Sequence, residues 1–502
     1  MPPCASASPP AGDHPGPHRL ETHPMPLLDP AAWQPRPLSG AEHPVTEPAT
    51  GDTLGHYRLA TTGDLADAAR VADAARHTWA ARPHAERAAV LRRAGELFTA
   101  HAAELRDWIV RETGSIPGKA DFELRVAAEE CFEAAALASR PLGQVLPSEA
   151  PRLSYTRRVP VGVVGVIAPF NVPLVLAIRS VAPALALGNA VLLKPDPRTA
   201  VSGGLALAAV FAAAGLPEDV LHVLPGDASM GQALVADPRV PVLSFTGSTT
   251  AGRAVGEAAG RHLTRAHLEL GGNSALIVRE DADIDAVIST AAWGSFFHQG
   301  QVCMTTGRHL VHASLYDEYV ARLAAKADSL GVGDPYREQV HLGPVIDQGQ
   351  LGRIHRLVEA STARGARLAA GGTHEGLFYR PTVLADVDED TPAYTEEVFG
   401  PVAPVRSFAD DDEAVKLAAA SPYGLALGIV TRDTARGLEL AERVPTGIVH
   451  INDQTVNDEA VAPFGGLGAS GTGARFGGEA NLDAFTETRW TTVRADVAGY
   501  PF

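Results

Sequence analysis

FTGSTTAGRAVGEAAG, residues 245–260, combines the end of an apolar run, a glycine turn and an alanine-rich stretch of helical length. A short apolar strand that ends in glycine and continues into a helix is typical of α/β proteins. Backbone N–H groups at the start of such a helix, together with the Ser248 hydroxyl, can hold a pyrophosphate. The stretch is not G-x-G-x-x-G, however, and by itself an ordinary helix capped by Ser248 explains it better.

The segments on either side repeat the same pattern. Short β-branched or aliphatic runs separated by Ala/Leu-rich helical stretches lie at 161–169, 190–195, 220–225, 240–247 and 265–272. Alternating strands and helices predict right-handed crossovers and a Rossmann-type parallel sheet with helices on both faces. Ligands of such sheets bind beyond the carboxyl ends of the strands. The residues placed at these ends are Asn171, Lys194, Gly247, Ser248 and Glu269.

Further from this region, the chain predicts additional structure at both ends. Residues 62–140 are helical in pattern, and a second α/β series runs over about 282–461, with strands at 306–313, 425–432 and 447–453. The stretches 152–162 and 485–495 both alternate polar and apolar residues, so they are expected to pair as strands. Such a ribbon either caps its own domain or presents an edge to another subunit.

Composition excludes several classes of function. The 502 residues carry a net charge of −17 and contain 45% hydrophobic residues, which predicts an ordinary globular protein and no nucleic-acid or membrane partner. The longest apolar run, 180–193, is too short and too interrupted to span a bilayer. Residues 1–40 are rich in Pro, Ala, His and Gly, lack the features of a secretory signal and predict a flexible tail, within which Met25 is an alternative start.

The cysteines limit the chemistry further. Cys4, Cys131 and Cys303 form neither a disulfide framework nor a zinc-binding spacing, so we expect a reducing, cytoplasmic location and no metal site. Cys303 lies in HQGQVCMTTG, residues 298–307, among glycines, amides and threonines. That polar setting suits a reactive thiolate, although on this stretch alone a buried structural cysteine is equally probable.

Other polar residues have two interpretations each. Glu269 closes a strand beside two glycines, where burial would raise its pKa and suit it as a general base; a capping or ion-paired glutamate is the alternative. Asn171 is either a helix cap or an oxyanion donor. Lys194 is suited to ribose or phosphate but would otherwise be an ordinary surface lysine, and Glu397 and Phe399 form an acidic–aromatic turn that often has only a structural role.

Taken together, these stretches resemble the aldehyde dehydrogenase superfamily from about residue 45 onward. Seven motifs occur in order: FNVP (Asn171), KP (Lys194), FTGSTTAG (Gly247, Ser248), LELGG (Glu269), GQVC (Cys303), EEVFGPV (Glu397, Phe399), and PFGG with SG at 463–471. Within the superfamily, the sequence around Cys303 and the stretches KPDPRTA and HINDQTVNDE are most similar to benzaldehyde, salicylaldehyde and vanillin dehydrogenases.

The resemblance implies a dinucleotide-binding domain (41–139 and 163–268), a catalytic domain (269–483) and oligomerisation strands (140–162 and 484–502) of a homodimer or homotetramer. It also implies a mechanism. The Cys303 thiolate attacks an aldehyde, and Asn171 with the Cys303 N–H holds the oxyanion that forms. Hydride then passes to NAD or NADP, which leaves a thioester. Glu269 activates the water that hydrolyses this thioester.

The resemblance also implies binding residues. Lys194, Gly247, Ser248, Gly252, Glu397 and Phe399 are expected to bind the cofactor, and the substrate tunnel is expected to be lined by Val172, Leu176, Arg179, Val302, Met304 and Asn457. Aliphatic and Met walls suit an aromatic ring. Arg179 either meets a polar substituent of the substrate or forms an ordinary ion pair.

The sequence departs from the family pattern at two places. Many members have a glutamate three positions after the lysine that corresponds to Lys194, where this chain has Pro197. Because Arg198 is nearby, the choice between NAD and NADP stays open. The resemblance slightly favours NAD. The stretch GTGARFGG, 471–478, stands where the family commonly has Gly-Arg-Glu.

Three other functions are weaker alternatives. A CoA-acylating enzyme has no use for Glu269 as a water-activating base, and a thiol hydrolase without nucleotide has no use for Lys194. A non-enzymatic protein would not need Cys303, Glu269 and Asn171 together. A dehydrogenase for an aliphatic aldehyde or a semialdehyde is the remaining alternative.

Overall fold

The predicted parallel sheet is present in the computed structural model, which describes residues 26–29, 34 and 36–502. Five strands form it in the order β7 (Leu221–Val223), β6 (Ala190–Lys194), β5 (Val163–Ile167), β8 (Val242–Thr246) and β9 (Arg265–Glu269). All neighbouring pairs are parallel. Each strand lies within the segment that its apolar run predicted.

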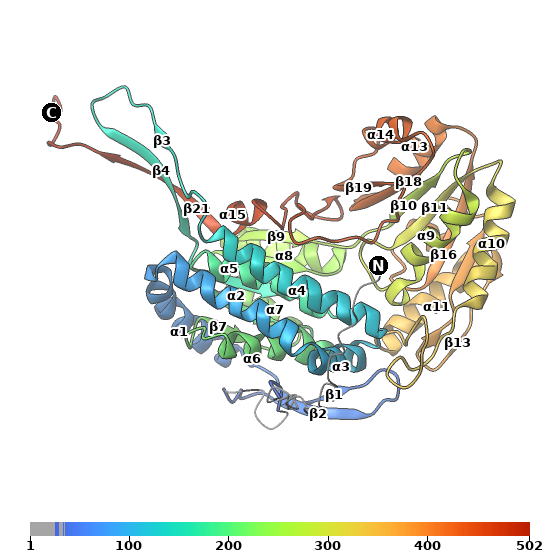
Figure 1. Ribbon diagram of the computed structural model, residues 1–502, viewed down its shortest axis with the longest axis horizontal. Coiled ribbons are helices and arrows are strands. Elements are labelled where there is room, and N and C mark those ends of the chain that lie inside the picture. The colour runs from blue at the N-terminus through green and yellow to red at the C-terminus, as the bar shows by residue number, and fades with distance from the viewer. Residues whose placement is uncertain (1–25, 30–33, 35) are drawn as a thin grey trace, which may run out of the picture.

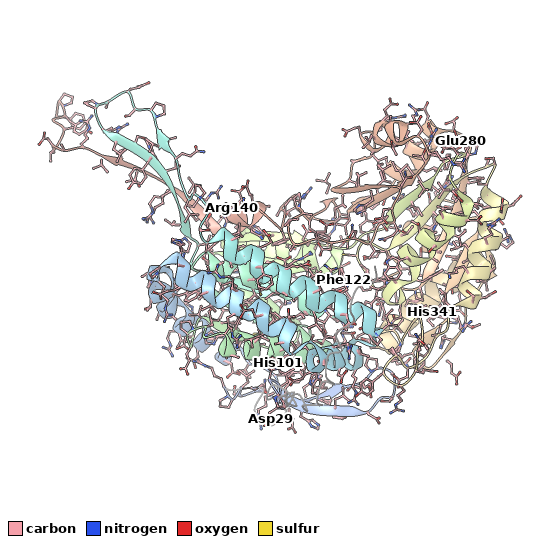
Figure 2. The ribbon with its side chains drawn as sticks, viewed as in Figure 1. Asp29, His101, Phe122, Arg140, Glu280 and His341 are labelled. Carbon is pink, nitrogen blue, oxygen red and sulfur yellow. The ribbon has the colours of Figure 1, made fainter. Side chains whose placement is uncertain are left out.

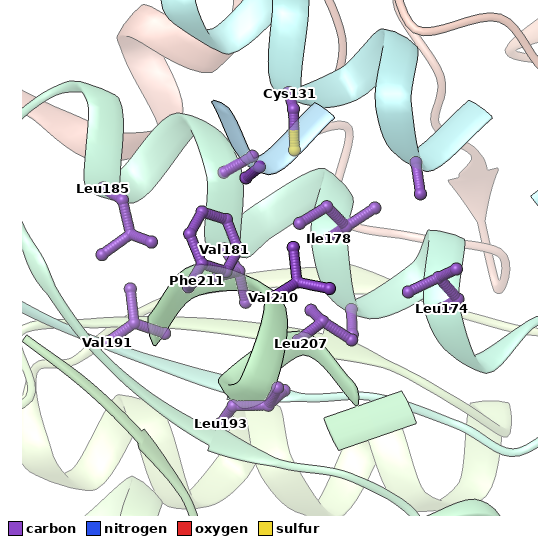
Figure 3. Packing of buried hydrophobic residues seen from close by; sticks show 14 of the residues in the cluster. Cys131, Leu174, Ile178, Val181, Leu185, Val191, Leu193, Leu207, Val210 and Phe211 are labelled. Carbon is purple, nitrogen blue, oxygen red and sulfur yellow. The ribbon is translucent and has the colours of Figure 1, made fainter. Parts of the chain in front are cut away.

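Helices cover both faces of this sheet, because its strands are apolar on both sides. Val191 and Leu193 of β6 pack on one face, whereas Leu192 packs on the other. The first face is covered by α2 (His84–Ala100), α4 (Pro117–Leu137), α5 (Pro173–Ala186) and α6 (Ala206–Ala213), and the second by α1 (Thr62–Ala81), α7 (Ala228–Ala236) and α8 (Thr249–His262). Figure 3 shows the first face, with α5 packed between β6, α6 and the Cys131 side chain of α4.

A second sheet lies in the C-terminal half of the chain. Its order is β12 (Arg367–Ala370), β15 (Thr382–Ala385), β16 (Val402–Phe408), β11 (Thr306–His312), β10 (Ser274–Val278), β18 (Ala426–Val430) and β19 (Ile448–Ile451). Only the β12–β15 pair is antiparallel. On one face lie α9 (Ile284–Phe296) and α10 (Tyr316–Ser329); on the other lie α11 (Gln348–Ala363), α13 (Asp411–Ala419) and α14 (Thr434–Ala441).

The two alternating stretches pair as predicted. β4 (Leu153–Pro160) and β21 (Thr486–Val493) are antiparallel over their whole length, and β3 (Val145–Leu146) adds a short third strand. Figure 1 shows these strands as an arm that extends away from the helices, with the C-terminus near its tip. Trp490 is 62% exposed on this arm.

The remaining elements connect these parts. The sequence analysis did not predict the hairpin of β1 (Glu42–Thr46) and β2 (Thr53–Arg58). The other elements are α3 (Ala102–Thr113), α12 (Pro392–Thr395), α15 (Ala480–Phe485), β13 (His374–Glu375), β14 (Phe378–Tyr379), β17 (Tyr423–Gly424) and β20 (Leu467–Gly468).

The predicted N-terminal tail, 1–40, lies largely outside the described residues, as does Cys4. Of its described part, Leu27 and Leu28 donate their backbone N–H groups to the Glu104 carboxylate, and the Leu28 side chain is buried. The apolar run 180–193 forms the second half of α5 and part of β6. Among all described helices, none is long and apolar enough to cross a membrane.

Candidate active site

Cys303 follows a strained turn at the end of α9. His298, Gln299 and Gly300 have φ values of 49°, 56° and 65°, a left-handed conformation that costs free energy in the two residues with side chains. Gly300 is required here, since a Cβ would lie 2.1 Å from the Gly400 carbonyl oxygen. The Gln299 Nε2 amide holds the turn by donating to the carbonyls of Gly114 and Pro344, at 2.9 and 2.7 Å. The glycine and amides around the cysteine therefore shape its loop.

Asn171 is tied to the same loop. It lies between β5 and α5, and its Nδ2 donates to the Gln301 carbonyl at 2.8 Å. Its own carbonyl accepts a hydrogen bond of 2.7 Å from the Lys119 Nζ of α4, which is paired in turn with Glu123. Both charged side chains are fully buried. A buried ion pair thus fixes the backbone that carries Asn171.

The electrostatic setting of Cys303 differs from the expected one. Burial, together with Glu397 and Glu269, raises the pKa of the thiol to about 12, although Arg179 opposes the rise. The prediction that the surroundings of Cys303 favour its thiolate is wrong in this structure. The polar residues next to Cys303 in the sequence stabilise the turn and do not lower the pKa of the thiol. Of the other cysteines, Cys131 is fully buried in the helical core and its pKa is raised by burial.

A polar cavity of about 370 Å³ leads to Cys303 from the carboxyl ends of the first sheet. Of the six residues predicted to bind a cofactor, it is lined by Lys194, Gly247, Ser248, Glu397 and Phe399. Gly252 is not among its lining residues. It lies inside α8, where a Cβ would meet Leu270 at 2.1 Å, so its role in the structure is to pack the helix against that residue.

Two charged groups in this cavity have few partners. Lys194 is 8% exposed, and within the described part of the chain its Nζ has a single long hydrogen bond, of 3.4 Å, to the neighbouring Pro195 carbonyl. The Glu397 carboxylate accepts a hydrogen bond from the Gly272 N–H, and burial raises its pKa to about 7. Buried polar groups left with unused hydrogen-bonding capacity fit a ligand that supplies hydroxyls or phosphates. The residues present therefore fit a dinucleotide.

Sequence reasoning missed Asp196, which also lines this cavity. It accepts hydrogen bonds from Arg198 Nε and Nη2, while Arg198 Nη1 bonds to Asp347 at 2.7 Å. The same guanidinium stacks over Phe170, 4.1 Å from the ring centre. Arg198 is thus already neutralised by two carboxylates. The family glutamate is expected three positions after the lysine, whereas this carboxylate lies two positions after it.

An apolar cavity of about 270 Å³ reaches Cys303 from the other side. Five of the six predicted substrate residues line it: Val172, Leu176, Val302, Met304 and Asn457. Sequence reasoning missed its aromatic side chains, Phe122, Trp293, Phe297 and Phe464. Trp293 stacks on Phe297 with ring centres 4.5 Å apart, and Figure 2 shows Phe122 on α4. Among these aromatics, Phe122 and Trp293 belong to helices that showed no distinctive motif.

The sixth residue, Arg179, is not a wall residue. Its side chain is 2% exposed, forms an ion pair with Asp458 and stacks over Phe464 at 4.3 Å. The ion-paired alternative describes it, and Asp458 rather than Arg179 reaches the cavity.

Glu269 lies at the end of β9 and lines neither cavity. Its side chain is 1% exposed, and burial raises its pKa well above the usual value, against the opposing influence of Arg179 and Arg475. Cys303, Glu269 and Arg179 are close enough to shift one another's pKa. In the described residues no cluster of His, Cys, Asp or Glu is arranged to hold a metal ion.

A doubly wound sheet whose polar crevice meets an apolar cavity at a cysteine defines the class of dinucleotide-dependent oxidoreductases. More closely, the chain belongs to the aldehyde dehydrogenase family, whose sequence model matches residues 36–491. It is 67% identical over 486 residues to a vanillin dehydrogenase of Amycolatopsis sp., which covers 95% of this chain and 100% of that protein. It is 50% identical to a benzaldehyde dehydrogenase [NAD(+)] of Pseudomonas putida, over 91% of this chain and 94% of that protein.

Solved structures agree. A salicylaldehyde dehydrogenase from Pseudomonas putida, complexed with salicylaldehyde, superimposes with a TM-score of 0.89 at 35% identity, over 92% of this chain and 96% of that one. The predicted family and the α/β fold are therefore confirmed. The protein is an aldehyde dehydrogenase, a member of a family that uses NAD or NADP.

Proposed function

We propose that this protein oxidises aromatic aldehydes to carboxylic acids through a thioester on Cys303, with NAD as the preferred cofactor. The observation that carries the proposal is the position of Cys303, whose side chain borders both the polar and the apolar cavity. A substrate in one cavity and a dinucleotide in the other would meet at this sulfur. Asn171 also borders both.

The first half-reaction forms a bond between the Cys303 sulfur and the aldehyde carbon. Asn171 has one amide N–H engaged with Gln301, and the other is available for the oxygen that becomes negative. The thiol is protonated at rest and Cys303 is partly exposed, so its proton would pass to solvent as the C–S bond forms. When bound, the dinucleotide supplies the hydride acceptor and a positively charged ring that favours the thiolate.

The second half-reaction hydrolyses the thioester. Glu269 is a buried carboxyl whose pKa is raised by burial, so its carboxylate is a stronger base than an exposed one and is suited to accept a proton from water. The water oxygen bonds to the acyl carbon, the C–S bond breaks, and the carboxylic acid leaves with Cys303 restored.

The preference for NAD rests on Asp196 and Arg198. A carboxylate in this part of the crevice can accept hydrogen bonds from ribose hydroxyls and repels a 2′-phosphate. Arg198 is engaged with Asp196 and Asp347, so it offers no free cation to that phosphate. Lys194 and Glu397 are the expected partners of the two riboses, Gly247 and Ser248 of the pyrophosphate, and Phe399 of the nicotinamide.

The aromatic substrate class rests on the apolar cavity. Flat aromatic and aliphatic walls, with Met304 among them, favour an aromatic ring. The relatives named vanillin, benzaldehyde and salicylaldehyde dehydrogenases support the same class.

We also infer a homo-oligomer in a reducing, cytoplasmic location. The arm of β4 and β21 exposes Leu153, Trp490 and Val493, which are apolar side chains that a second subunit would cover. A catalytic thiol needs surroundings that keep it reduced.

The test is stopped-flow absorbance of reduced nicotinamide, with benzaldehyde or vanillin and either NAD or NADP. We expect a burst with NAD and an acid product without added CoA. Cys303→Ala should bind NAD yet lose turnover, and Glu269→Gln should give the burst and then stall as a thioester. Substantial turnover by Cys303→Ala would rule out the covalent route, and faster reaction with NADP would refute the role given to Asp196.

A further inference from the structure

The Glu269 carboxyl occupies a niche built from glycine. A Cβ on Gly465 would lie 2.8 Å from Glu269 Oε1, and one on Gly471 would lie 3.5 Å from it, so side chains at these positions would fill the niche. Neither carboxyl oxygen has a hydrogen-bond partner of normal geometry among the described residues. Hydrogen bonds of normal geometry therefore do not hold the carboxyl in place.

Arg475 lies beside the same glycine. Its Cδ is 2.9 Å from the Cβ position of Gly465, which puts this carbon less than about 6 Å from Glu269 Oε1. The Nη1 group donates to the carbonyls of Ala474 and Gly466, at 3.0 and 3.3 Å, and so keeps the guanidinium beside the niche. No carboxylate lies within ion-pair distance of Arg475 in the described part of the chain.

The other charged groups that face Glu269 are already balanced or neutral. Arg179 from α5 is paired with Asp458, and the Cys303 thiol is protonated at rest. Arg179 and Arg475 both favour the ionised form of Glu269, but of these two cations only Arg179 has an ion-pair partner among the described residues. An opposite charge near a buried carboxyl favours its ionised form, and Arg475 acts on Glu269 in this direction.

We propose that Arg475 is a positioning residue that keeps the Glu269 carboxylate ionised in the glycine niche, ready to take a proton from water when the thioester forms. The inference rests on the proposed function and deepens it. Arg475 stands in GTGARFGG, the stretch in which this sequence departs from the family pattern. Burial raises the pKa of Glu269, Asp458 adds to the rise, and Arg179, Arg475 and the Gly466 amide oppose it.

The direction of the effect follows from the charge. Without the Arg475 cation, the pKa of Glu269 rises further, so the base is ionised only at higher pH. Removal of an opposite charge disfavours the ionised carboxyl. Hydrolysis of the thioester therefore slows below the new pKa, by about tenfold for a rise of one pKa unit, and recovers in alkaline solution.

The experiment uses the full-length protein with saturating NAD and benzaldehyde between pH 5.5 and 9.5. Three variants are compared with the unaltered protein: Arg475→Gln, Arg475→Lys and, as a matched control, the exposed Arg432→Gln. The burst is followed by absorbance. The thioester is trapped by acid quenching and counted by mass spectrometry, so hydrolysis is measured whichever step limits turnover.

We expect Arg475→Gln to keep the rate of the burst and the affinity for NAD, while the acid limb of thioester hydrolysis moves to higher pH. Arg475→Lys should restore the original limb, and Arg432→Gln should leave it in place. An unmoved limb in Arg475→Gln would overturn the proposal. So would equal slowing of burst and hydrolysis, or a folded Arg475→Lys protein that behaves like Arg475→Gln.

A failure of the proposed function itself would be recognised separately. The unaltered protein would then show no burst or no trapped thioester, whatever the behaviour of the variants. If Arg475→Gln does not fold, the acid limb of thioester hydrolysis in Arg475→Lys still tests the proposal. A positive charge at this position predicts the limb of the unaltered protein, whereas a packing role for arginine predicts a shifted one.

Discussion

The two cavities that meet at Cys303 differ in how they use charge. In the polar cavity, Lys194 and Glu397 have few internal partners, so their hydrogen-bonding capacity is available to a ligand. In the wall of the apolar cavity the charged side chains form ion pairs with each other. Lys119 pairs with Glu123, and Asp458 pairs with Arg179. Under the proposed function, one cavity would bind its ligand through its charges, whereas the other uses charges to hold its walls and the Asn171 backbone in position.

Removal of one charge from a pair in the wall of the apolar cavity should have the largest effect on stability. Lys119→Met should lower the free energy of unfolding by about 3–5 kcal/mol, because it leaves Glu123 buried without its counter-ion. It also removes the donor to the Asn171 carbonyl. Urea denaturation followed by tryptophan fluorescence measures the loss.

The chain offers a matched control on the same helix. Arg125 and Glu129 form a pair with the same spacing of four residues, but both are exposed. Arg125→Met should therefore cost less than about 0.5 kcal/mol. Equal losses in the two variants would mean that burial does not distinguish these pairs.

The amide shared by both cavities comes next. Asn171→Ala should lower kcat by about 10²–10³-fold, because it removes a donor to the developing oxyanion. The backbone carbonyl that accepts from Lys119 is retained, so NAD binding should stay close to that of the unaltered protein, while loss of the buried bond to the Gln301 carbonyl should cost about 1–3 kcal/mol of stability. A loss confined to KM for the aldehyde would instead make Asn171 a wall residue only.

The same contrast explains how much the sequence could predict. Asn171, Lys194, Glu269 and Cys303 were predictable because each follows a strand or a glycine turn, where local pattern marks a change of structure. Phe122 and Trp293 were not, because they lie on helices whose apolar periodicity is the same for core and cavity walls.

Long-range contacts were equally beyond local pattern. The bond from Lys119 to Asn171 joins α4 to the loop after β5, and Arg475 approaches Glu269 from a distant loop. The pKa of Cys303 depends on burial created by the whole site. Its polar neighbours in the sequence therefore predicted a shift of this pKa in the wrong direction. The turn at His298 and Gln299 explains those neighbours as structural.

On the polar side, removal of one charge should affect binding rather than folding. Lys194→Ala should raise the Kd of NAD about ten- to a hundredfold, the range for hydrogen bonds to charged groups. Lys326→Ala, on the exposed surface of α10, is the control and should leave Kd unchanged. Calorimetric titration measures both. A large loss of stability in Lys194→Ala, with Kd retained, would place this lysine among the structural charges of the other cavity.

The smallest expected effect is the pH dependence of NAD binding. The Glu397 pKa of about 7 means that this carboxyl is protonated below neutral pH and ionised above it. An ionised carboxylate accepts stronger hydrogen bonds from ribose hydroxyls, so NAD should bind about fivefold more tightly at pH 8 than at pH 6. Glu397→Gln should abolish this dependence and keep the weaker affinity throughout. Deprotonation of Lys194 would act in the opposite direction, because loss of its charge weakens binding as pH rises. Calorimetry without aldehyde therefore separates the two groups by sign: affinity that rises through pH 7 assigns the effect to Glu397, and affinity that falls would show that the titrating group of this cavity is the lysine.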